Sequence, residues 1–186
     1  FCELLVLMPG ESVQGIEIKE MRGEAMNENI ERLMPLKVVP YAHQRKAFFF
    51  ACDKFGVFDE NLKSSGTALL MEMGTGKTIV SIAVAGCMYQ RGKIKRVLVV
   101  APLSILGVWE EELEKFADFP YTLTVLKGTA AKKKEQLSRL HGEELQVVVV
   151  NYESAWRLEK ELLSYDADLV IADEAHKLKE NRTSQS

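Results

Sequence analysis

Short apolar runs alternate with longer segments of helical spacing along the chain from residue 40 onward. The runs read TALLME, RVLVVAP, YTLTVLKG, LQVVVVNYE and ADLVIADEAH. Valine-rich runs without polar alternation indicate strands buried on both faces, as in a parallel sheet covered by helices. The chain is therefore predicted to adopt a doubly wound α/β fold, with a mostly parallel sheet and helices on both faces.

Residues 1–35 do not follow this alternation. They contain the apolar run FCELLVLM, the alternating stretch VQGIEIKEM, which suits a strand, and the helix-like stretch NENIERLM. These residues carry no recognisable motif. We expect an N-terminal extension without an assigned role at 1–35 and a single domain over 36–186.

A glycine-rich loop, MEMGTGKTIV at 71–80, joins one apolar run to a helical segment. Gly74 and Gly76 allow a tight turn whose N–H groups point inward, where they can surround phosphate oxygens. Lys77 would reach the β- and γ-phosphates, and Thr78 would offer its hydroxyl to Mg²⁺. A glycine-rich turn followed by a solvated lysine is the structural alternative. The nucleotide ligands predicted from this loop are Met73, Gly74, Thr75, Gly76, Lys77 and Thr78.

A pair of carboxylates ends the last apolar run, LVIADEAH. Asp173 would hold Mg²⁺, mainly through water, and Glu174 would orient and deprotonate the attacking water. Two acids that cap a strand beside a helix start are the alternative. The loop and the acid pair need each other chemically. Together they predict a nucleotide triphosphatase with Lys77, Asp173 and Glu174 as catalytic residues.

The segments MEMGTGKT and DEAH resemble the first and second helicase motifs of superfamily 2, and their surroundings resemble the Swi/Snf-type double-stranded DNA translocases. That branch has an acidic residue where this chain has Met71. It continues its DEAH with a basic residue, a hydrophobic one, Lys and a small loop ending in Ser, which here reads DEAHKLKENRTSQS. The resemblance covers about residues 36–186. It implies the RecA-like P-loop NTPase fold, ATP and Mg²⁺ as cofactors, double-stranded DNA as partner and DNA-stimulated ATP hydrolysis.

Three weaker motifs match the same family. VPYAHQRKAF resembles the stretch in which a glutamine reads adenine, which implies that role for Gln44. VVAPLSILGVWEEELEKF resembles a motif that contacts a DNA backbone, so Ser104 would donate to a phosphate, whereas Trp109 is expected in the core. VVVNYESAW resembles the next backbone-contact motif, with Asn151 and Tyr152 at a strand end. A polar residue near a helix start, and packing at a strand end, are the alternatives.

Two further residues receive a role from the resemblance. Lys127 begins the basic stretch KGTAAKKKEQLSRLH, which lies near the duplex in the family, although a charge run is more often a solvated helix face. His176 would couple the nucleotide state to nucleic-acid binding through a partner in a later motif of the family.

Members of the family hydrolyse ATP between two RecA-like lobes, and the second lobe supplies arginines to the γ-phosphate. The chain begins with Phe1 rather than Met and stops ten residues after DEAH, without any of the later motifs. We therefore expect a fragment that is inactive by itself, with the second lobe on the same polypeptide.

The expected function is the ATP-binding lobe of an ATP-dependent double-stranded DNA translocase or remodeller. A strand-separating superfamily 2 helicase, such as the motor subunit of a restriction enzyme, shares nearly all of these residues. A non-hydrolysing nucleotide-binding scaffold is an alternative of another class. The joint presence of Lys77 and Glu174 disfavours the scaffold, because a protein that only binds nucleotide has no chemical need of both.

Composition adds the expected location. A net charge of −3 gives no bulk attraction to nucleic acid, so any DNA contact requires a local basic face. The three cysteines are odd in number and far apart, which favours reduced thiols in a cytoplasmic protein. No stretch approaches transmembrane length, so we expect no membrane partner. The compact acidic chain favours a bacterial or phage origin, and a eukaryotic protein of this kind would be nuclear.

Overall fold

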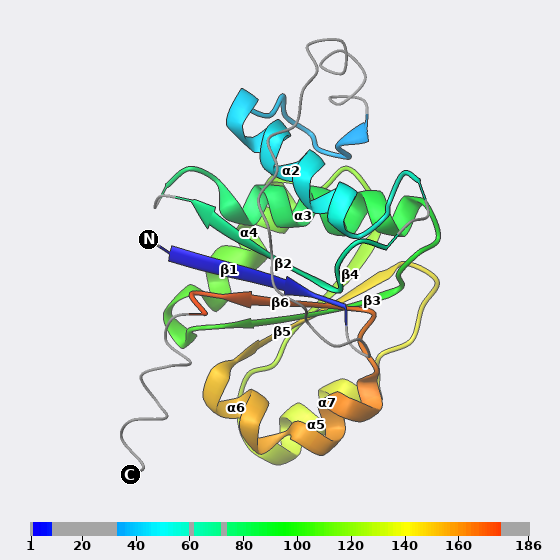
Figure 1. Ribbon diagram of the computed structural model, residues 1–186. Coiled ribbons are helices and arrows are strands. Elements are labelled where there is room, and N and C mark those ends of the chain that lie inside the picture. The colour runs from blue at the N-terminus through cyan, green and yellow to red at the C-terminus, as the bar shows by residue number, and fades with distance from the viewer. Residues whose placement is uncertain (1, 9–32, 60–61, 72–73, 176–186) are drawn as a thin grey trace.

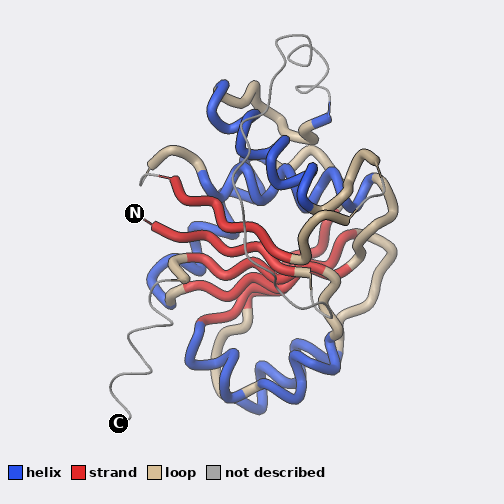
Figure 2. Tube along the Cα trace, in the orientation of Figure 1, coloured by secondary structure: helices blue, strands red, loops and turns tan. Residues whose placement is uncertain are grey.

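The computed structural model describes residues 2–8, 33–59, 62–71 and 74–175 (Figures 1 and 2). Each of the five apolar runs predicted as strands after residue 40 forms a strand within these ranges. The strands are β1 (Cys2–Leu7), β2 (Gly66–Met71), β3 (Arg96–Ala101), β4 (Tyr121–Val125), β5 (Leu145–Asn151) and β6 (Leu169–Asp173). The helices are α2 (Ala42–Lys54), α3 (Lys77–Gln90), α4 (Leu106–Phe116), α5 (Ala130–Ser138), α6 (Tyr152–Arg157) and α7 (Glu159–Tyr165), with a 3₁₀ turn η2 (Leu103–Ile105).

The strands form one six-stranded sheet in the order β2-β1-β6-β3-β5-β4. The pairs β6 with β3, β3 with β5, and β5 with β4 are parallel. Strand β1 runs antiparallel to both β2 and β6, so β2 itself points the same way as the other strands. The predicted mostly parallel sheet is confirmed, with β1 as the exception.

Strand β1 lies inside the sheet, although its segment received no role from the sequence. Leu4 pairs with Leu69 on one side and with Asp173 on the other, and the side chains of Leu4 and Val6 are fully buried. The segment CELLVL is apolar enough for a buried strand. Its position depends on pairing with residues more than sixty positions away, which no local pattern encodes.

Helices cover both faces of the sheet, as predicted. Figure 1 shows α2 and α3 on one side and α5, α6 and α7 on the other. Because successive strand residues point to opposite faces, Val97 and Val99 join the core shared with α2, α3 and α4. Leu98 and Val148 face the smaller core beneath α6 and α7.

The segment AWRLEKELLS at 155–164, whose helical spacing favours a single helix, belongs to two short helices. Leu158, with φ −107° and ψ 22°, separates α6 from α7, and its side chain is buried in the smaller core. The longest helix that the structure describes is α3, with 14 residues. None of the described helices is long and apolar enough to span a bilayer.

Candidate nucleotide site

The described candidate residues lie along one edge of the sheet. Since β2, β6, β3, β5 and β4 point the same way, their carboxyl ends meet at that edge. The glycine-rich loop follows β2, the acid pair ends β6, and Ser104 follows β3. Asn151 ends β5, and Lys127 follows β4. Ligands of open α/β sheets bind at this edge, so the arrangement fits a ligand site.

The loop between β2 and α3 needs glycine at position 76. Gly76 has φ +85°, a left-handed conformation that residues with a Cβ rarely adopt. A Cβ atom at Gly76 would also lie 2.2 Å from Nε2 of Gln44. As the N-cap of α3, Gly76 has no side chain to occupy the first turn. The N-terminal end of α3 is thereby suited to an anion.

Helix α2 braces this loop through two side chains. Gln44 is 6% exposed, donates from Nε2 to the Thr75 carbonyl at 3.1 Å, and accepts from the Tyr41 N–H at 2.9 Å. His43 Nε2 lies 2.9 Å from the same Thr75 carbonyl. The structure thus places Gln44 beside the glycine-rich loop, with both ends of its amide bonded to the backbone.

Lys77 and Thr78 open helix α3, directly after the turn that follows β2. The ammonium of Lys77 donates to the Met71 carbonyl at 3.5 Å, and its positive charge favours the ionised form of Asp173. The hydroxyl of Thr78 lies near the carboxylate of Glu112 on α4. Burial raises the pKa of Glu112, and the nearby Thr78 hydroxyl opposes that rise.

All three oxygen atoms of Asp173 accept hydrogen bonds. Its Oδ2 accepts from Trp109 Nε1 at 3.1 Å, and its Oδ1 accepts from the Glu174 N–H at 3.0 Å. Its carbonyl accepts from the Tyr152 hydroxyl at 2.6 Å. Burial raises the pKa of Asp173, while the bonds from Trp109 and Glu174 favour the charged carboxylate. The result is an oriented carboxylate at the end of a buried strand.

Glu174 adopts a strained backbone conformation. Its φ is 52°, and a residue other than glycine in this region costs on the order of 1–3 kcal/mol. Such strain concentrates at sites where function fixes the direction of a side chain. Glu174 is partly buried and directly follows Asp173 at the end of β6.

The four candidates for nucleic-acid contact differ in exposure. Ser104 in η2 is exposed, and so is Lys127, whose ammonium lies 3.5 Å from Glu110. Asn151 is 9% exposed and is the N-cap of α6. Tyr152 is partly buried because its hydroxyl reaches the backbone of β6; burial first, and then nearby carboxylates, raise its pKa to about 12.

Two of the predicted residues, Met73 and His176, lie outside the described residues. Two others were missed by the sequence analysis. Trp109 belongs to the core, as expected, but its indole N–H also holds Asp173, and Glu112 reaches Thr78. The spacing i, i+3 on an amphipathic helix indicated a shared face for these two residues, without indicating what that face meets.

The oxygen atoms at the site suit a hard cation such as Mg²⁺. The hydroxyl of Thr78 and the carboxylates of Asp173 and Glu112 lie on adjoining elements, and Mg²⁺ prefers oxygen ligands. Among the described residues, no cluster of three or more His, Cys, Asp or Glu side chains could cage a metal ion. The residues present therefore fit an ion that shares its ligands with a nucleotide.

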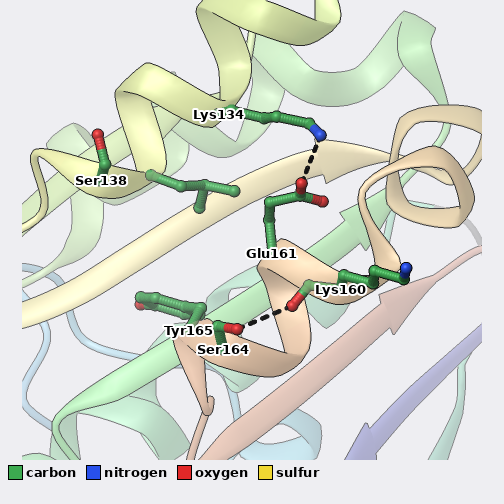
Figure 3. Close-up of a pocket in the computed structure, with 7 residues that line it drawn as sticks. Lys134, Ser138, Lys160, Glu161, Ser164 and Tyr165 are labelled. Atoms are coloured by element: carbon green, nitrogen blue, oxygen red, sulfur yellow. Dashed lines mark hydrogen bonds and ion pairs between the residues drawn. The ribbon is translucent and has the colours of Figure 1, made fainter.

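A surface pocket of about 390 Å³ lies elsewhere, between α5 and α7 (Figure 3). Lys134 on its wall pairs with Glu161 at 2.5 Å, and the Ser164 hydroxyl donates to the Lys160 carbonyl at 3.0 Å. Tyr165 also lines the pocket, and its hydroxyl donates to the Gln146 carbonyl at 3.0 Å. The pocket belongs to the helix layer on the other face of the sheet from α3.

Comparison with known proteins gives consistent matches. The model of the SNF2-related domain matches residues 21–186. DNA repair and recombination protein RAD54 of Oryza sativa subsp. japonica is 29% identical over 166 residues, which cover 83% of this chain and 16% of that protein. The putative ATP-dependent helicase/translocase YwqA of Bacillus subtilis is 34% identical over 122 residues, 65% of this chain and 13% of that protein.

A solved structure also aligns with the chain. It is the Sulfolobus solfataricus SWI2/SNF2 ATPase core in complex with dsDNA, with 25% sequence identity and a TM-score of 0.48. The alignment covers 66% of this chain and 23% of that one. This chain spans about a sixth of the length of the rice relative.

Proposed function

The chain belongs to the SNF2-related family, and from this membership we propose that it is the ATP-binding lobe of an ATP-dependent double-stranded DNA translocase or remodeller. One observation carries the proposal. The glycine-rich loop and the acid pair, distant in sequence, follow the carboxyl ends of β2 and β6 and so lie at one edge of the sheet. A nucleotide triphosphatase requires both groups around one phosphate chain.

Each residue then has a defined task. Lys77 and the loop N–H groups would bind the β- and γ-phosphates, and Thr78 and Asp173 would hold Mg²⁺. The ion neutralises the charge of the phosphates when it is bound. Glu174 orients the attacking water and takes its proton. Gln44 would read adenine after releasing the Thr75 carbonyl that it now binds.

Duplex DNA is the proposed track. The rice relative is named for DNA repair and recombination, and the exposed Ser104 and Lys127 lie at the same sheet edge as the nucleotide groups. A hydroxyl and an ammonium are suited to phosphate oxygens, which fix register on a duplex without reading bases. Asn151 and Tyr152 lie between them on the edge and would support this surface.

Hydrolysis requires more than this lobe. In such motors a second RecA-like lobe supplies arginine to the γ-phosphate, a contribution worth roughly 10³–10⁵ in rate. We therefore propose that the chain alone binds nucleotide weakly and turns it over poorly. Joined to a second lobe, it would close and open around ATP and step along DNA.

Replacing Lys77 by alanine tests the nucleotide site. The Lys77→Ala chain should lose ATP binding, measured by isothermal titration in Mg²⁺, because the loop loses its only side-chain cation for the phosphates. Lys93→Ala is a matched control, since Lys93 is an exposed lysine ahead of β3, at the opposite edge of the sheet. ATP affinity that is unchanged in Lys77→Ala would contradict the assignment.

The nucleic-acid substrate is tested on the polypeptide that joins this lobe to its second lobe. ATP hydrolysis should rise strongly with duplex DNA, and no strands should separate. Stimulation by single-stranded DNA or RNA would instead indicate an unwinding helicase. Nucleotide binding without hydrolysis on any nucleic acid would indicate a scaffold.

A further inference from the structure

We infer that Trp109 is a positioning residue of the nucleotide site: its indole N–H orients Asp173 toward the Mg²⁺ that the carboxylate would hold. This inference rests on the proposed function and deepens it. The sequence predicts only a core position for Trp109. The structure gives the same side chain a polar contact with the metal-binding carboxylate.

The geometry of the contact is specific. Trp109 is 2% exposed, and Nε1 donates to Asp173 Oδ2 at 3.1 Å within a buried environment. Indole has a single hydrogen-bonding group, a donor, and burying that donor without an acceptor is costly. This hydrogen bond therefore fixes the orientation of the Trp109 ring and of the Asp173 carboxylate relative to each other.

The bond leaves Asp173 able to bind a cation. An ionised carboxylate offers about four lone-pair sites, and the two N–H groups from Trp109 and Glu174 occupy one on each oxygen. One site on each oxygen is left for a metal-bound water. Because each carboxylate oxygen accepts one of these hydrogen bonds, the Asp173 carboxylate is held in one orientation, and its remaining lone pairs point in fixed directions.

A second contact from the same helix supports this role. Glu112 lies three residues after Trp109, on the same face of α4, with its carboxylate near the hydroxyl of Thr78. Helix α4 thus touches both groups expected to face Mg²⁺, one on β6 and one on α3. Core packing alone would account for the burial of Trp109. It would not explain why the Trp109 N–H and the Glu112 carboxylate both lie against residues of the candidate site.

The first test uses Trp109→Phe in the whole chain. Phenylalanine keeps an aromatic ring in the core and removes only the donor. The affinity for Mg²⁺–ADP should fall about tenfold, the loss typical of one hydrogen bond to a charged group, while affinity for ADP in EDTA should stay unchanged. Tyr165→Phe is the matched control, because it also removes one buried aromatic donor, on the other face of the sheet.

The outcomes separate the two claims. Equal Mg²⁺–ADP affinities for Trp109→Phe and the unchanged chain would overturn the positioning role and leave the proposed function intact. A parallel loss in Mg²⁺ and in EDTA would also overturn it, because it would indicate a general structural defect. An unchanged chain that binds no nucleotide would overturn the proposed function, and the metal role of Trp109 with it.

The second test reads the hydrogen bond directly. The chain has two tryptophans, and Trp156 is 83% exposed, so the two indole N–H signals in a ¹H–¹⁵N spectrum report on one buried and one exposed ring. Asp173→Asn should shift the Trp109 signal, and Mn²⁺–ADP should broaden it, with the Trp156 signal unchanged in both cases. A Trp109 signal that responds to neither change would overturn the inference.

Discussion

Helices α3 and α5 both follow an edge strand of the sheet, yet they are held in opposite ways. Helix α3 follows β2 and is buried at every position from Ile79 to Met88. Helix α5 follows β4 at the other edge and contains no buried residue. The helix that presents Lys77 and Thr78 is the fully packed one. The comparison indicates that groups needing a fixed position are placed on a rigid element.

The difference follows from what surrounds each helix. Helix α3 is apolar on all sides and is enclosed by the sheet and its neighbours α2 and α4. Helix α5 is held by local contacts: the Thr129 hydroxyl caps its first turn by accepting from the Lys132 N–H at 3.3 Å, and Lys134 pairs with Glu161. The pocket of Figure 3 lies where α5 fails to pack closely on α7.

The largest expected effect tests this comparison in the core. Ile82 on α3 is 1% exposed, so Ile82→Ala should lower the free energy of unfolding by about 2–5 kcal/mol through lost burial and a cavity. Leu137 on α5 is only partly buried, and Leu137→Ala should cost about 1 kcal/mol or less. Urea unfolding of both variants measures the difference. Equal losses would show that α5 contributes to the core as much as α3 does.

The next effect concerns how closely neighbouring side chains pack against α3. A Cβ atom at Gly86 would lie 2.3 Å from the Phe119 ring and 2.7 Å from Pro35 Cγ. We expect Gly86→Ala to destabilise the chain by about 1–3 kcal/mol, because neighbours of a packed helix must move. At Gly107 on α4 a Cβ meets nothing within 4 Å, so Gly107→Ala should stabilise by up to about 1 kcal/mol through helix propensity.

Thermal unfolding of these two glycine variants gives opposite shifts if packing around α3 is as close as the structure indicates. A stabilising Gly86→Ala would mean that Phe119 and Pro35 yield easily, and it would remove the main reason for treating α3 as rigid.

The same contrast explains how far the sequence predicts this molecule. The strands, the glycine-rich turn and the start of α3 at Lys77 were predictable, because apolar periodicity and glycine chemistry are local. The position of β1 and the bond between Trp109 and Asp173 were not, since each depends on residues more than sixty positions apart. A buried tryptophan on an amphipathic helix indicates packing, and only the assembled sheet provides the acceptor for its N–H.

The smallest expected effect concerns the cap of α5. Thr129→Ala removes the oxygen that accepts from the Lys132 N–H, a loss of about 1 kcal/mol in typical N-caps. Thr129→Ser retains the hydroxyl and is the matched control. Since α5 has little packing to compensate, its amides should exchange with deuterium faster in Thr129→Ala, while those of α3 keep their protection. Faster exchange in both helices would mean that they unfold as one unit. It would contradict the proposal that α3 and α5, at opposite edges of the sheet, are stabilised independently.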